Sequence, residues 1–354
     1  MKALILSGGT GTRLRPFTHS NPKQLLPVAN KPVLEHCIEA VSRIGVSEIG
    51  IIVGDRLDQI APVIEARDHP NAHITYIEQS KPLGLAHCVS IARDFLGDDD
   101  FVMYLGDNIL GDGIADAAAA FRARKPDAHI MVAAVDDPRS YGVAEVEPDG
   151  RVLRLVEKPA DPRSNLAIIG VYFFSAAVHD AVREITPSAR GELEITDAIQ
   201  HMSSAGRLVV AQEYAGYWKD TGKPEDLLEC NRVMLERLDT SIAGEIDADT
   251  VVHGSVVIEA GAKVTRSVLA GPLAIAAGSV ISDSTIGPGS AIGRDCLIEG
   301  SSIRNTIVLD AASINQVSGL HNSIIGRHAD ISGVSGPAPF RLFVGDHSYA
   351  AVGR

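Results

Sequence analysis

The chain has 354 residues, of which 45% are hydrophobic and 22% charged, and its formal net charge at pH 7 is −13. This length suits two domains, and the composition is ordinary for a soluble globular protein. No apolar run approaches the roughly 20 residues of a membrane span. The acidic balance argues against a nucleic-acid partner but not against a nucleotide substrate, because a small site is controlled by its own cations and any bound metal.

The chain begins with an apolar run at residues 3–6, which predicts a short buried strand. The run is too short for the apolar core of a signal peptide, so we expect a cytoplasmic protein without a membrane partner. The cysteines are scattered without a CxxC pair, which argues against a zinc site and against a disulfide framework. We expect all four to be small buried hydrophobic residues: Cys37, Cys88, Cys230 and Cys296.

A glycine-rich segment, SGGTGT at residues 7–12, follows the first strand and supplies flexible backbone with exposed N–H groups. Such backbone can approach an anion closely, and Arg13, Arg15 and Lys23 add positive charge within a short distance along the chain. An ordinary glycine-rich turn is the alternative. The phosphate-binding interpretation gains support from three prolines that stiffen the segment: Pro16, Pro22 and Pro27.

Two common phosphate-binding motifs do not fit this segment. A Walker loop requires a lysine after the last glycine, and no lysine follows Gly11. A dinucleotide fingerprint requires a third glycine, and Leu14 stands where it would be. If the segment binds phosphate, it therefore does so as a loop of another kind.

The sequences GGTGTRLRPFT (8–18) and PKQLLPVANKP (22–32) resemble the signature of the sugar-1-phosphate nucleotidylyltransferases, most closely the long-form glucose-1-phosphate thymidylyltransferases. The resemblance implies that the loop holds the nucleotide, that Arg13 binds the phosphates, and that Lys23 neutralises charge in the transition state. The implied nucleotide contacts in this region are Leu6, Gly8, Gly9, Gly11, Thr12 and Arg13.

Helical and apolar patterns alternate after this segment. We predict helices at 34–44 and 57–66 and strands at 49–53, 74–77 and 101–105. A βαβαβ order implies an α/β fold with a Rossmann-like, mostly parallel sheet flanked by helices. Ligands bind such sheets at the carboxyl ends of the strands, where the opening loop lies. The resemblance points to the nucleotide-diphospho-sugar transferase type of this fold.

The segment QSKPLGLA at 79–86 predicts a turn between a strand and a helix, with Gly84 near the helix start. An amide offers a donor and an acceptor side by side, which matches the edge of a pyrimidine. The resemblance implies that Gln79, Pro82 and Gly84 contact the base.

Two aspartates follow probable strands, Asp107 in GDN and Asp220 in WKDTG. Each could be a simple turn residue. If they converge on one crevice, they suit Mg²⁺, which is commonly held by one or two carboxylates plus substrate phosphates. The resemblance implies that both are metal ligands and catalytic residues, with Mg²⁺ as cofactor.

Three further segments resemble parts of the family that hold the sugar phosphate: YGVAE (141–145), VEKP (156–159) and RGELEITD (190–197). An exposed strand end is the alternative for VEKP, and capping of a helix at 197–203 is the alternative for Glu194. The implied contacts of the sugar phosphate are Tyr141, Gly142, Glu157, Lys158, Ile168, Tyr172, Glu194 and Trp218.

A helix is predicted at 224–238, and aliphatic residues then recur every six positions, with corresponding positions 17 apart at Val252, Leu269, Ile286 and Ile303. This hexapeptide pattern predicts a parallel β-helix, and its left hand is implied by the resemblance to hexapeptide-repeat proteins. We expect two domains, a catalytic domain at 1–240 and the β-helix at 241–354. The closing segment 339–348 is expected to cap one end.

The implied reaction is transfer of a nucleoside monophosphate from dTTP to glucose 1-phosphate, giving dTDP-glucose and pyrophosphate for deoxysugar or cell-surface sugar synthesis. UTP is an alternative nucleotide. A bifunctional uridylyltransferase and acetyltransferase is a second alternative, with His253, His321, His328 and His347 as candidate bases. A non-catalytic nucleotide-sugar-binding regulatory protein is the third. We expect a homo-oligomer, trimer or tetramer, and a chain cut after Leu238 that keeps measurable activity.

Overall fold

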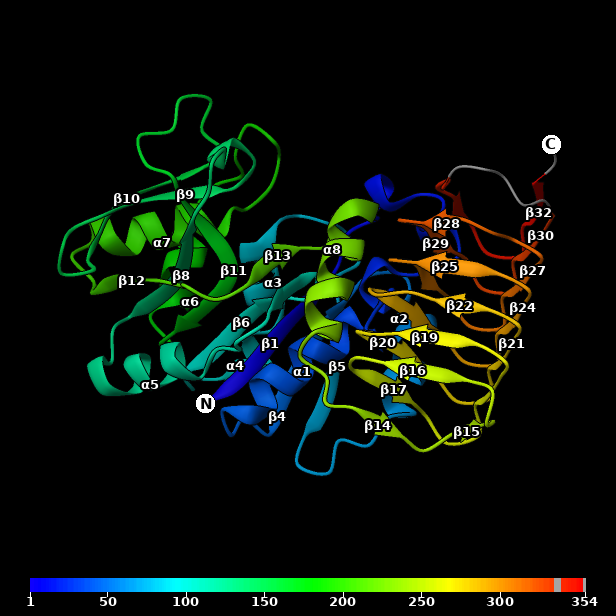
Figure 1. Cartoon of the computed structure of the whole chain (residues 1–354). Coiled ribbons are helices and arrows are strands. Elements are labelled where there is room, and N and C mark those ends of the chain that lie inside the picture. The colour runs from blue at the N-terminus through cyan, green and yellow to red at the C-terminus, as the bar shows by residue number, and fades with distance from the viewer. Residues whose placement is uncertain (334–338, 353–354) are drawn as a thin grey trace. The chain divides into compact units, whose positions relative to one another are not determined.

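A computed structural model of the chain describes residues 1–333 and 339–352 (Figure 1). It divides into two compact units, each discontinuous in sequence. Unit 1 consists of Met1–Gly9 and Leu34–Asp220, and unit 2 consists of Thr10–Val33 and Thr221–Arg354. Residues 10–33, which carry most of the family signature, therefore group with the C-terminal part of the chain. None of the helices described is long and apolar enough to cross a membrane.

The first half of the sheet in unit 1 is parallel. Its strands are β1 (Lys2–Ser7), β4 (Glu48–Val53), β5 (His73–Glu78) and β6 (Phe101–Leu105), in the order β6-β1-β4-β5. β1 lies between two parallel neighbours, β4 and β6, and Figure 1 shows this blue strand inside the sheet. A strand paired on both sides in this way is buried, which explains its continuous apolar run.

The second half of the sheet is largely antiparallel. β11 (Leu166–Phe174) runs antiparallel to β6, β8 and β9, whereas β12 pairs parallel to β8. β9 and β10 are consecutive antiparallel strands that form a hairpin. Antiparallel strands can be joined by a short turn, whereas parallel strands need a longer crossover. The Rossmann-like α/β class is confirmed, but the sheet is more mixed than the expected mostly parallel one. The other strands are β8 (Ala128–Ala134), β9 (Gly142–Val146), β10 (Val152–Glu157) and β12 (Val209–Glu213).

Helices flank this sheet, and their apolar faces join its strands in one core that includes Met103, Ile130 and Ile199. The helices expected at 34–44, 57–66 and 197–203 are present with ends shifted by one or two residues. The helices are α1 (Val33–Arg43), α2 (Leu57–Glu65), α3 (Leu85–Ile91), α4 (Arg93–Leu96), α5 (Ala115–Arg124), α6 (Val178–Glu184) and α7 (Ile195–Ser204).

Unit 2 contains α8 (Pro224–Leu235) and a left-handed parallel β-helix with three ladders of strands. The first ladder is β14 (Ser241–Ile242), β17 (Val256–Ile258), β20 (Leu273–Ile275), β23 (Ser290–Ile292), β26 (Ile307–Val308), β29 (Ile324–Ile325) and β31 (Phe343–Val344). The second is β15 (Glu245–Ile246), β18 (Lys263–Thr265), β21 (Val280–Ser282), β24 (Leu297–Glu299), β27 (Ser313–Asn315), β30 (Asp330–Gly333) and β32 (Tyr349–Val352). The third is β16 (Val251–His253), β19 (Val268–Ala270), β22 (Thr285–Ile286), β25 (Ser302–Arg304) and β28 (Leu320–His321).

Each coil of the β-helix turns one aliphatic side chain per strand inward. Ile258, Ile275 and Ile292 are register partners on successive coils, and all three are fully buried. The next partner is Val308, so this coil is one residue shorter than the coil before it. The shortening explains why the hexapeptide pattern changes phase in the sequence after Ile303.

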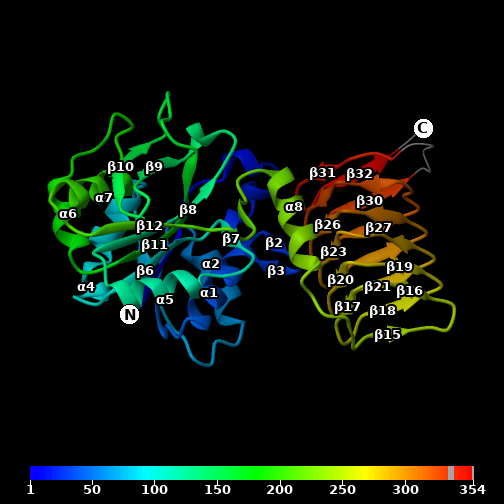
Figure 2. The ribbon, with the colours of Figure 1, turned by 60° about the vertical axis from the view of Figure 1, so that its left-hand side comes forward.

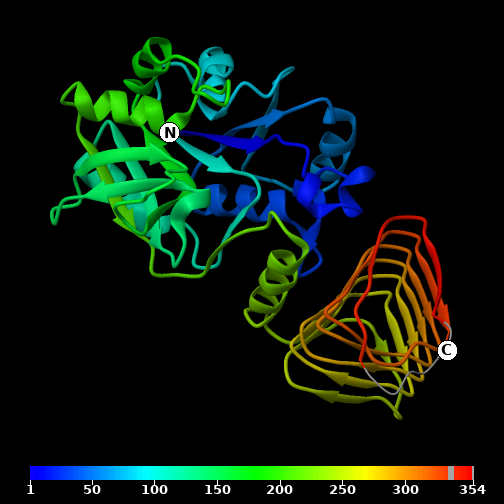
Figure 3. The same ribbon diagram turned by 90° about the horizontal axis from the view of Figure 1, so that it is seen from above.

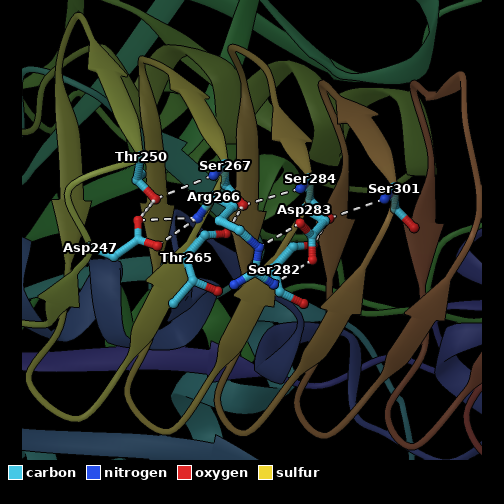
Figure 4. A network of polar contacts seen from close by, with 9 residues as sticks. All are labelled: Asp247, Thr250, Thr265, Arg266, Ser267, Ser282, Asp283, Ser284 and Ser301. Atoms are coloured by element: carbon cyan, nitrogen blue, oxygen red, sulfur yellow. Dashed lines mark hydrogen bonds and ion pairs between the residues drawn. The ribbon is translucent and has the colours of Figure 1, made fainter.

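Buried turn hydroxyls form a second repeating contact in the β-helix (Figure 4). Ser267 Oγ accepts a hydrogen bond from the backbone N–H of Ser284, 3.1 Å away, and Ser284 Oγ accepts one from Ser301, 3.0 Å away. Each hydroxyl also donates to a carbonyl two residues earlier in its own turn. The serines therefore satisfy backbone groups that the turns would otherwise bury without partners.

The C-terminal segment continues the stack of coils. β31 and β32 pair parallel to β29 and β30, at the red end of the β-helix in Figure 2. Figure 3 shows the coils nested over one another, with this last one among them. The segment expected to cap one end, 339–348, lies at one end of the stack and forms part of a further coil, since it adds strands to two ladders.

Candidate active site

The glycine-rich loop begins in unit 1, where β1 ends. Leu6 is buried at the end of this strand, and Gly9 has a φ of 93°, a conformation that favours glycine. A Cβ placed on Gly8 would lie 3.7 Å from Oε1 of Gln79. The structure therefore brings the start of the glycine loop next to the side chain that the sequence assigns to base recognition.

The Gln79 amide is held by two neighbours. Its Nε2 lies 3.3 Å from the carbonyl oxygen of Gly84 and 3.0 Å from Nδ1 of His87. With the amide nitrogen turned toward these groups, Oε1 is left on the side of Gly8. Pro82 lies in the same loop and is exposed.

Gly84 is in very close contact with Leu193, more than 100 residues away in sequence. A Cβ on Gly84 would lie 2.4 Å from the carbonyl oxygen of Leu193, and the φ of Gly84 is 104°. Two backbone hydrogen bonds join the same segments, from Leu193 to Leu83 and from Ala86 to Leu193. Only glycine fits here, and the contact links the loop at 79–86 to the segment that begins at Arg190.

Asp107 directly precedes β7 (Asn108–Leu110), and Asp220 is the last residue of β13 (Trp218–Asp220). The two strands form a small antiparallel sheet. Its register places Asp220 opposite Asn108, the residue after Asp107. Asn108 donates from Nδ2 to Asp107 at 2.9 Å and accepts from the Trp218 indole at 2.8 Å. The pairing therefore places both carboxylates at one end of the same two-stranded sheet.

A bulge supports this arrangement. The register of β11 shifts between Ile168 and Tyr172, where Gly170 has a φ of 79°. A Cβ on Gly170 would lie 3.1 Å from Nδ2 of Asn108. The bulge thus brings β11 against the asparagine that contacts Asp107.

Five of the predicted sugar-phosphate residues gather around the β9–β10 hairpin. Gly142 and Glu157 are register partners, and a Cβ on Gly142 would lie 3.0 Å from Cδ1 of Ile168. Glu157 accepts a hydrogen bond from the Thr196 hydroxyl at 3.3 Å. Lys158, with a φ of 43°, donates its N–H to the Tyr141 carbonyl and extends its ammonium group to 3.4 Å from Glu157.

Arg190 joins this cluster to Glu194. Its guanidinium lies 3.4 Å from Glu157 and 3.3 Å from Glu194, and Ser188 donates a hydrogen bond to Glu194. Glu194 is the N-cap residue of α7, but its side chain makes no capping hydrogen bond. Its carboxylate therefore belongs to the Arg190 cluster, and the alternative of helix capping is wrong.

Aromatic residues complete the group. Tyr141 and Trp218 meet edge to face with ring centroids 5.4 Å apart. Tyr172 is buried and stacks on Phe174. Burial, and next the charge of Glu157, raise the pKa of the Tyr172 hydroxyl, so this group stays protonated.

The remaining signature residues lie in unit 2. Gly11 has a φ of 61°, and a Cβ there would lie 3.1 Å from Cβ of Lys23. Thr18 donates its hydroxyl hydrogen bond to the Gly11 carbonyl at 2.7 Å. Gly11 precedes a 3₁₀ turn, Thr12–Leu14, in which Thr12 and Arg13 are exposed. The glycine loop and Lys23 are thus adjacent within this segment.

The donor set at Asp107 and Asp220 fits Mg²⁺, a hard cation that takes oxygen ligands. Among the residues described there is no group of three or more His, Cys, Asp or Glu side chains arranged around a metal position. A pair of carboxylates is the donor set expected where substrate phosphates complete the coordination of Mg²⁺.

Three contact residues escaped the sequence reasoning. Arg190 reads as a surface cation, although its place in an acidic run, RGELE, is a usable signal. Asn108 and His87 act on Asp107 and Gln79 through side-chain contacts that only the fold reveals.

The cysteines are confirmed as free, buried residues. Burial raises the pKa of Cys88 and of Cys296 to about 12, so neither thiol ionises near neutral pH.

Residues 2–237 match the model of a protein family described as nucleotidyl transferase. The chain is 54% identical to a glucose-1-phosphate thymidylyltransferase of Streptomyces griseus over 267 residues. The aligned region covers 75% of each protein. It is 48% identical to a low-salt glycan biosynthesis nucleotidyltransferase of Haloferax volcanii over 74% of each. The chain belongs to the nucleotidyl transferase family.

Two further comparisons extend this result. A bifunctional protein GlmU of Methanocaldococcus jannaschii is 36% identical over 74% of this chain, a match that spans 61% of that protein. A crystal structure described as a glucose-1-phosphate thymidylyltransferase of Bacillus anthracis superimposes with a TM-score of 0.61 at 34% identity, covering 66% of this chain and 95% of the other.

Proposed function

We propose that this protein transfers a thymidylyl group from dTTP to glucose 1-phosphate, giving dTDP-glucose and pyrophosphate. The observation that carries the proposal is the cluster in unit 1, where Gln79, the Asp107–Asp220 pair and the Glu157–Arg190 group are each built by separate contacts. The similarity to thymidylyltransferases supports dTTP and glucose 1-phosphate as the substrates.

In the proposed reaction, a phosphate oxygen of glucose 1-phosphate attacks the α-phosphorus of dTTP. The bond from this phosphorus to the bridging oxygen breaks, and pyrophosphate leaves with the electron pair. The attacking phosphate has a second pKa of about 6 and is already ionised near neutrality, so no general base is required. The work left for the protein is to align two anions and to stabilise the charge that develops.

The charged residues and Gln79 have the following roles in this scheme. Arg13 and Lys23 would bind the phosphates of the nucleotide, and Lys158 the phosphate of the sugar. Gln79 would hydrogen-bond the pyrimidine edge through the oxygen that it turns toward Gly8. Mg²⁺, when bound, would be held by Asp107 and Asp220 and would supply positive charge to the polyphosphate.

Glu157 is suited to the sugar rather than to the phosphate. Its carboxylate is fixed by Thr196 and Arg190 and can accept hydrogen bonds from hydroxyl groups. The adjacent Gly142 leaves no room for a side chain, because Ile168 and Thr196 already occupy the space around it. The backbone of Gly142, the register partner of Glu157, is proposed as a second hydrogen-bonding group for the sugar.

The bifunctional alternative gains no support from the candidate bases. His321 contacts the Phe340 carbonyl through Nδ1, and His328 stacks on His347 with ring centroids 4.9 Å apart. These three histidine rings therefore have structural contacts within the β-helix. We also propose that the protein forms a homo-oligomer, a trimer or tetramer, which light scattering after size exclusion would test.

The test of the function is pyrophosphate release across a grid of nucleoside triphosphates and sugar 1-phosphates. The highest kcat/KM is expected with dTTP, or next with UTP, together with glucose 1-phosphate. A clear preference for CTP, ATP or GTP would contradict the assignment of Gln79. Nucleotide-sugar binding without any turnover would favour the regulatory alternative.

A further inference from the structure

The signature segment, residues 10–33, has little regular structure of its own. It contains three 3₁₀ turns, Thr12–Leu14, Phe17–His19 and Lys23–Leu25, and a hairpin of two-residue strands, β2 (Pro27–Val28) and β3 (Lys31–Pro32). Elements this short do not hold their geometry alone. The contacts that fix this segment within unit 2 therefore decide how firmly Arg13 and Lys23 are placed.

The last coil of the β-helix supplies a polar clamp. One oxygen of Asp346 accepts hydrogen bonds from Ser20, at 2.7 Å, and from the Asn21 amide, at 2.5 Å. The Arg327 guanidinium donates to Oδ1 of the same asparagine, so both ends of the Asn21 amide are held. Asn21 is only 7% exposed, and hydrogen bonds to charged groups are the stronger kind.

The second oxygen of Asp346 fixes the clamp to the coil. It accepts the backbone N–H of Arg327 at 2.8 Å, between neighbouring coils. The carboxylate is thus shared between the β-helix and the signature segment.

An apolar contact accompanies this clamp. Phe17 is fully buried and meets Phe343 of β31 edge to face, with ring centroids 6.2 Å apart. The guanidinium of Arg341 lies over the Phe343 ring, with Cζ 4.2 Å from the ring centroid. A Cβ on Gly345 would lie 3.1 Å from Pro16, which shows how closely the coil approaches the segment.

A second anchor lies at the other end of the signature segment. Asn30 donates to the carbonyl oxygen of Ile292 at 2.8 Å, and the N–H of Ala29 donates to Asn231 of α8 at 2.8 Å. Asn231 in turn donates to the Gly289 carbonyl in a turn of the β-helix. Lys23 therefore lies between two fixed points, Asn21 and Ala29.

We propose that the β-helix is a positioning part of the catalytic apparatus, in which Asp346 and Arg327 hold the signature segment so that Arg13 and Lys23 are preorganised for the nucleotide phosphates. Asp346 and Arg327 are positioning residues, since they act through Asn21 and Ser20. The proposal rests on the proposed function for the roles of Arg13 and Lys23. It replaces the expectation that a chain cut after Leu238 keeps its activity.

The chain offers a matched control for Asp346. Asp310 occupies a similar turn, where one of its oxygens accepts the backbone N–H of Arg294 at 2.9 Å. Among the contacts described it has none with the signature segment. Asp310→Ala and Asp346→Ala thus remove the same kind of turn hydrogen bond, but only the second removes the clamp.

The experiment compares the full-length wild type, Asp346→Ala and Asp310→Ala by steady-state kinetics and by hydrogen–deuterium exchange. We expect Asp346→Ala to lower kcat/KM for dTTP by about tenfold or more, because only a fraction of molecules would hold the loop correctly. KM for glucose 1-phosphate, whose proposed contacts lie in unit 1, should stay within about twofold. Exchange should rise in peptides from residues 10–33 of this variant, whereas Asp310→Ala should match the wild type in both measurements.

Ser20→Ala, which removes one bond from the exposed side of the clamp, is the milder variant if Asp346→Ala folds poorly. It should show the same pattern with a smaller change. Faster exchange without a kinetic effect would overturn the proposal, and so would a kinetic effect without faster exchange. If the wild type does not use dTTP at all, the proposed function fails, while the exchange result still decides whether Asp346 holds the segment.

Discussion

The mixed sheet of unit 1 and the β-helix of unit 2 use their side chains in opposite ways. Along the β-helix the same contact recurs coil after coil, as in the fully buried aliphatic register partners Val264, Ile281 and Ile298. In unit 1 each assigned residue has a different partner, and several close contacts depend on one glycine, such as Gly84 or Gly170. Contacts that repeat from coil to coil give a stable scaffold. Contacts that occur only once give each part of unit 1 a different chemical environment.

The signature segment, residues 10–33, combines features of the two regions. Its sequence is aperiodic and carries the cations assigned to chemistry, but the contacts that fix it within unit 2 come from coils of the β-helix. In the proposed arrangement, a repetitive scaffold supports chemistry through a few turn residues that do not repeat.

The largest effect is expected at the two aspartates proposed to hold Mg²⁺. Asp107→Asn or Asp220→Asn should lower kcat by roughly a thousandfold, because the amide keeps the shape and loses the charge that would hold Mg²⁺. Pyrophosphate release at saturating Mg²⁺ measures this, with thermal melting to confirm the fold. Asp116→Asn, an exposed change in α5, is the control. Near-normal turnover of Asp220→Asn would show that the two-carboxylate site is wrong.

The next effect concerns the close approach at Gly84. Gly84→Ala should lower the free energy of unfolding by about 3 kcal/mol or more, because the new Cβ meets the Leu193 backbone and the φ is positive. Gly206→Ala is the control, since Gly206, after the end of α7, also has a positive φ but has open space around its Cβ position, and it should cost about 1 kcal/mol. Urea unfolding measures both, and equal losses would refute the steric contact.

A third prediction concerns pH and the core of unit 1. Burial lowers the pKa of His129 in β8 from 6.5 to about 4. The unfolded state therefore binds the proton first, so stability is complete above pH 6.5 and falls as the pH drops toward 4, by about 3 kcal/mol from this group. Urea unfolding of the wild type and of His129→Leu across this range should show the smaller pH dependence in the variant. Parallel curves would mean that His129 does not stay neutral in the fold.

These features differ in how far the sequence could predict them. The strands around β1 and the hexapeptide positions follow from apolar periodicity, which depends only on the residue and its near neighbours. The contact of Gly84 with Leu193 and the pairing of Asp220 with Asn108 join residues far apart, so no local pattern encodes them. Arg190 and Asp346 were missed for the same reason, because a surface cation and a turn aspartate look alike whether or not a partner faces them.

The smallest effect is expected within the periodic scaffold. Ile298→Val removes one inward methylene group from β24 and should lower the free energy of unfolding by about 1 kcal/mol, because a solenoid confines the loss to neighbouring coils. Leu297→Val, at the adjacent outward position that is 49% exposed, should cost almost nothing.

Leu297 is the register partner of Val280, which is also exposed, so the two form an outward apolar pair. If urea unfolding shows a cost for Leu297→Val that depends on protein concentration, this face is covered by another copy of the chain, and the contrast between inward and outward positions holds only for the separated protomer.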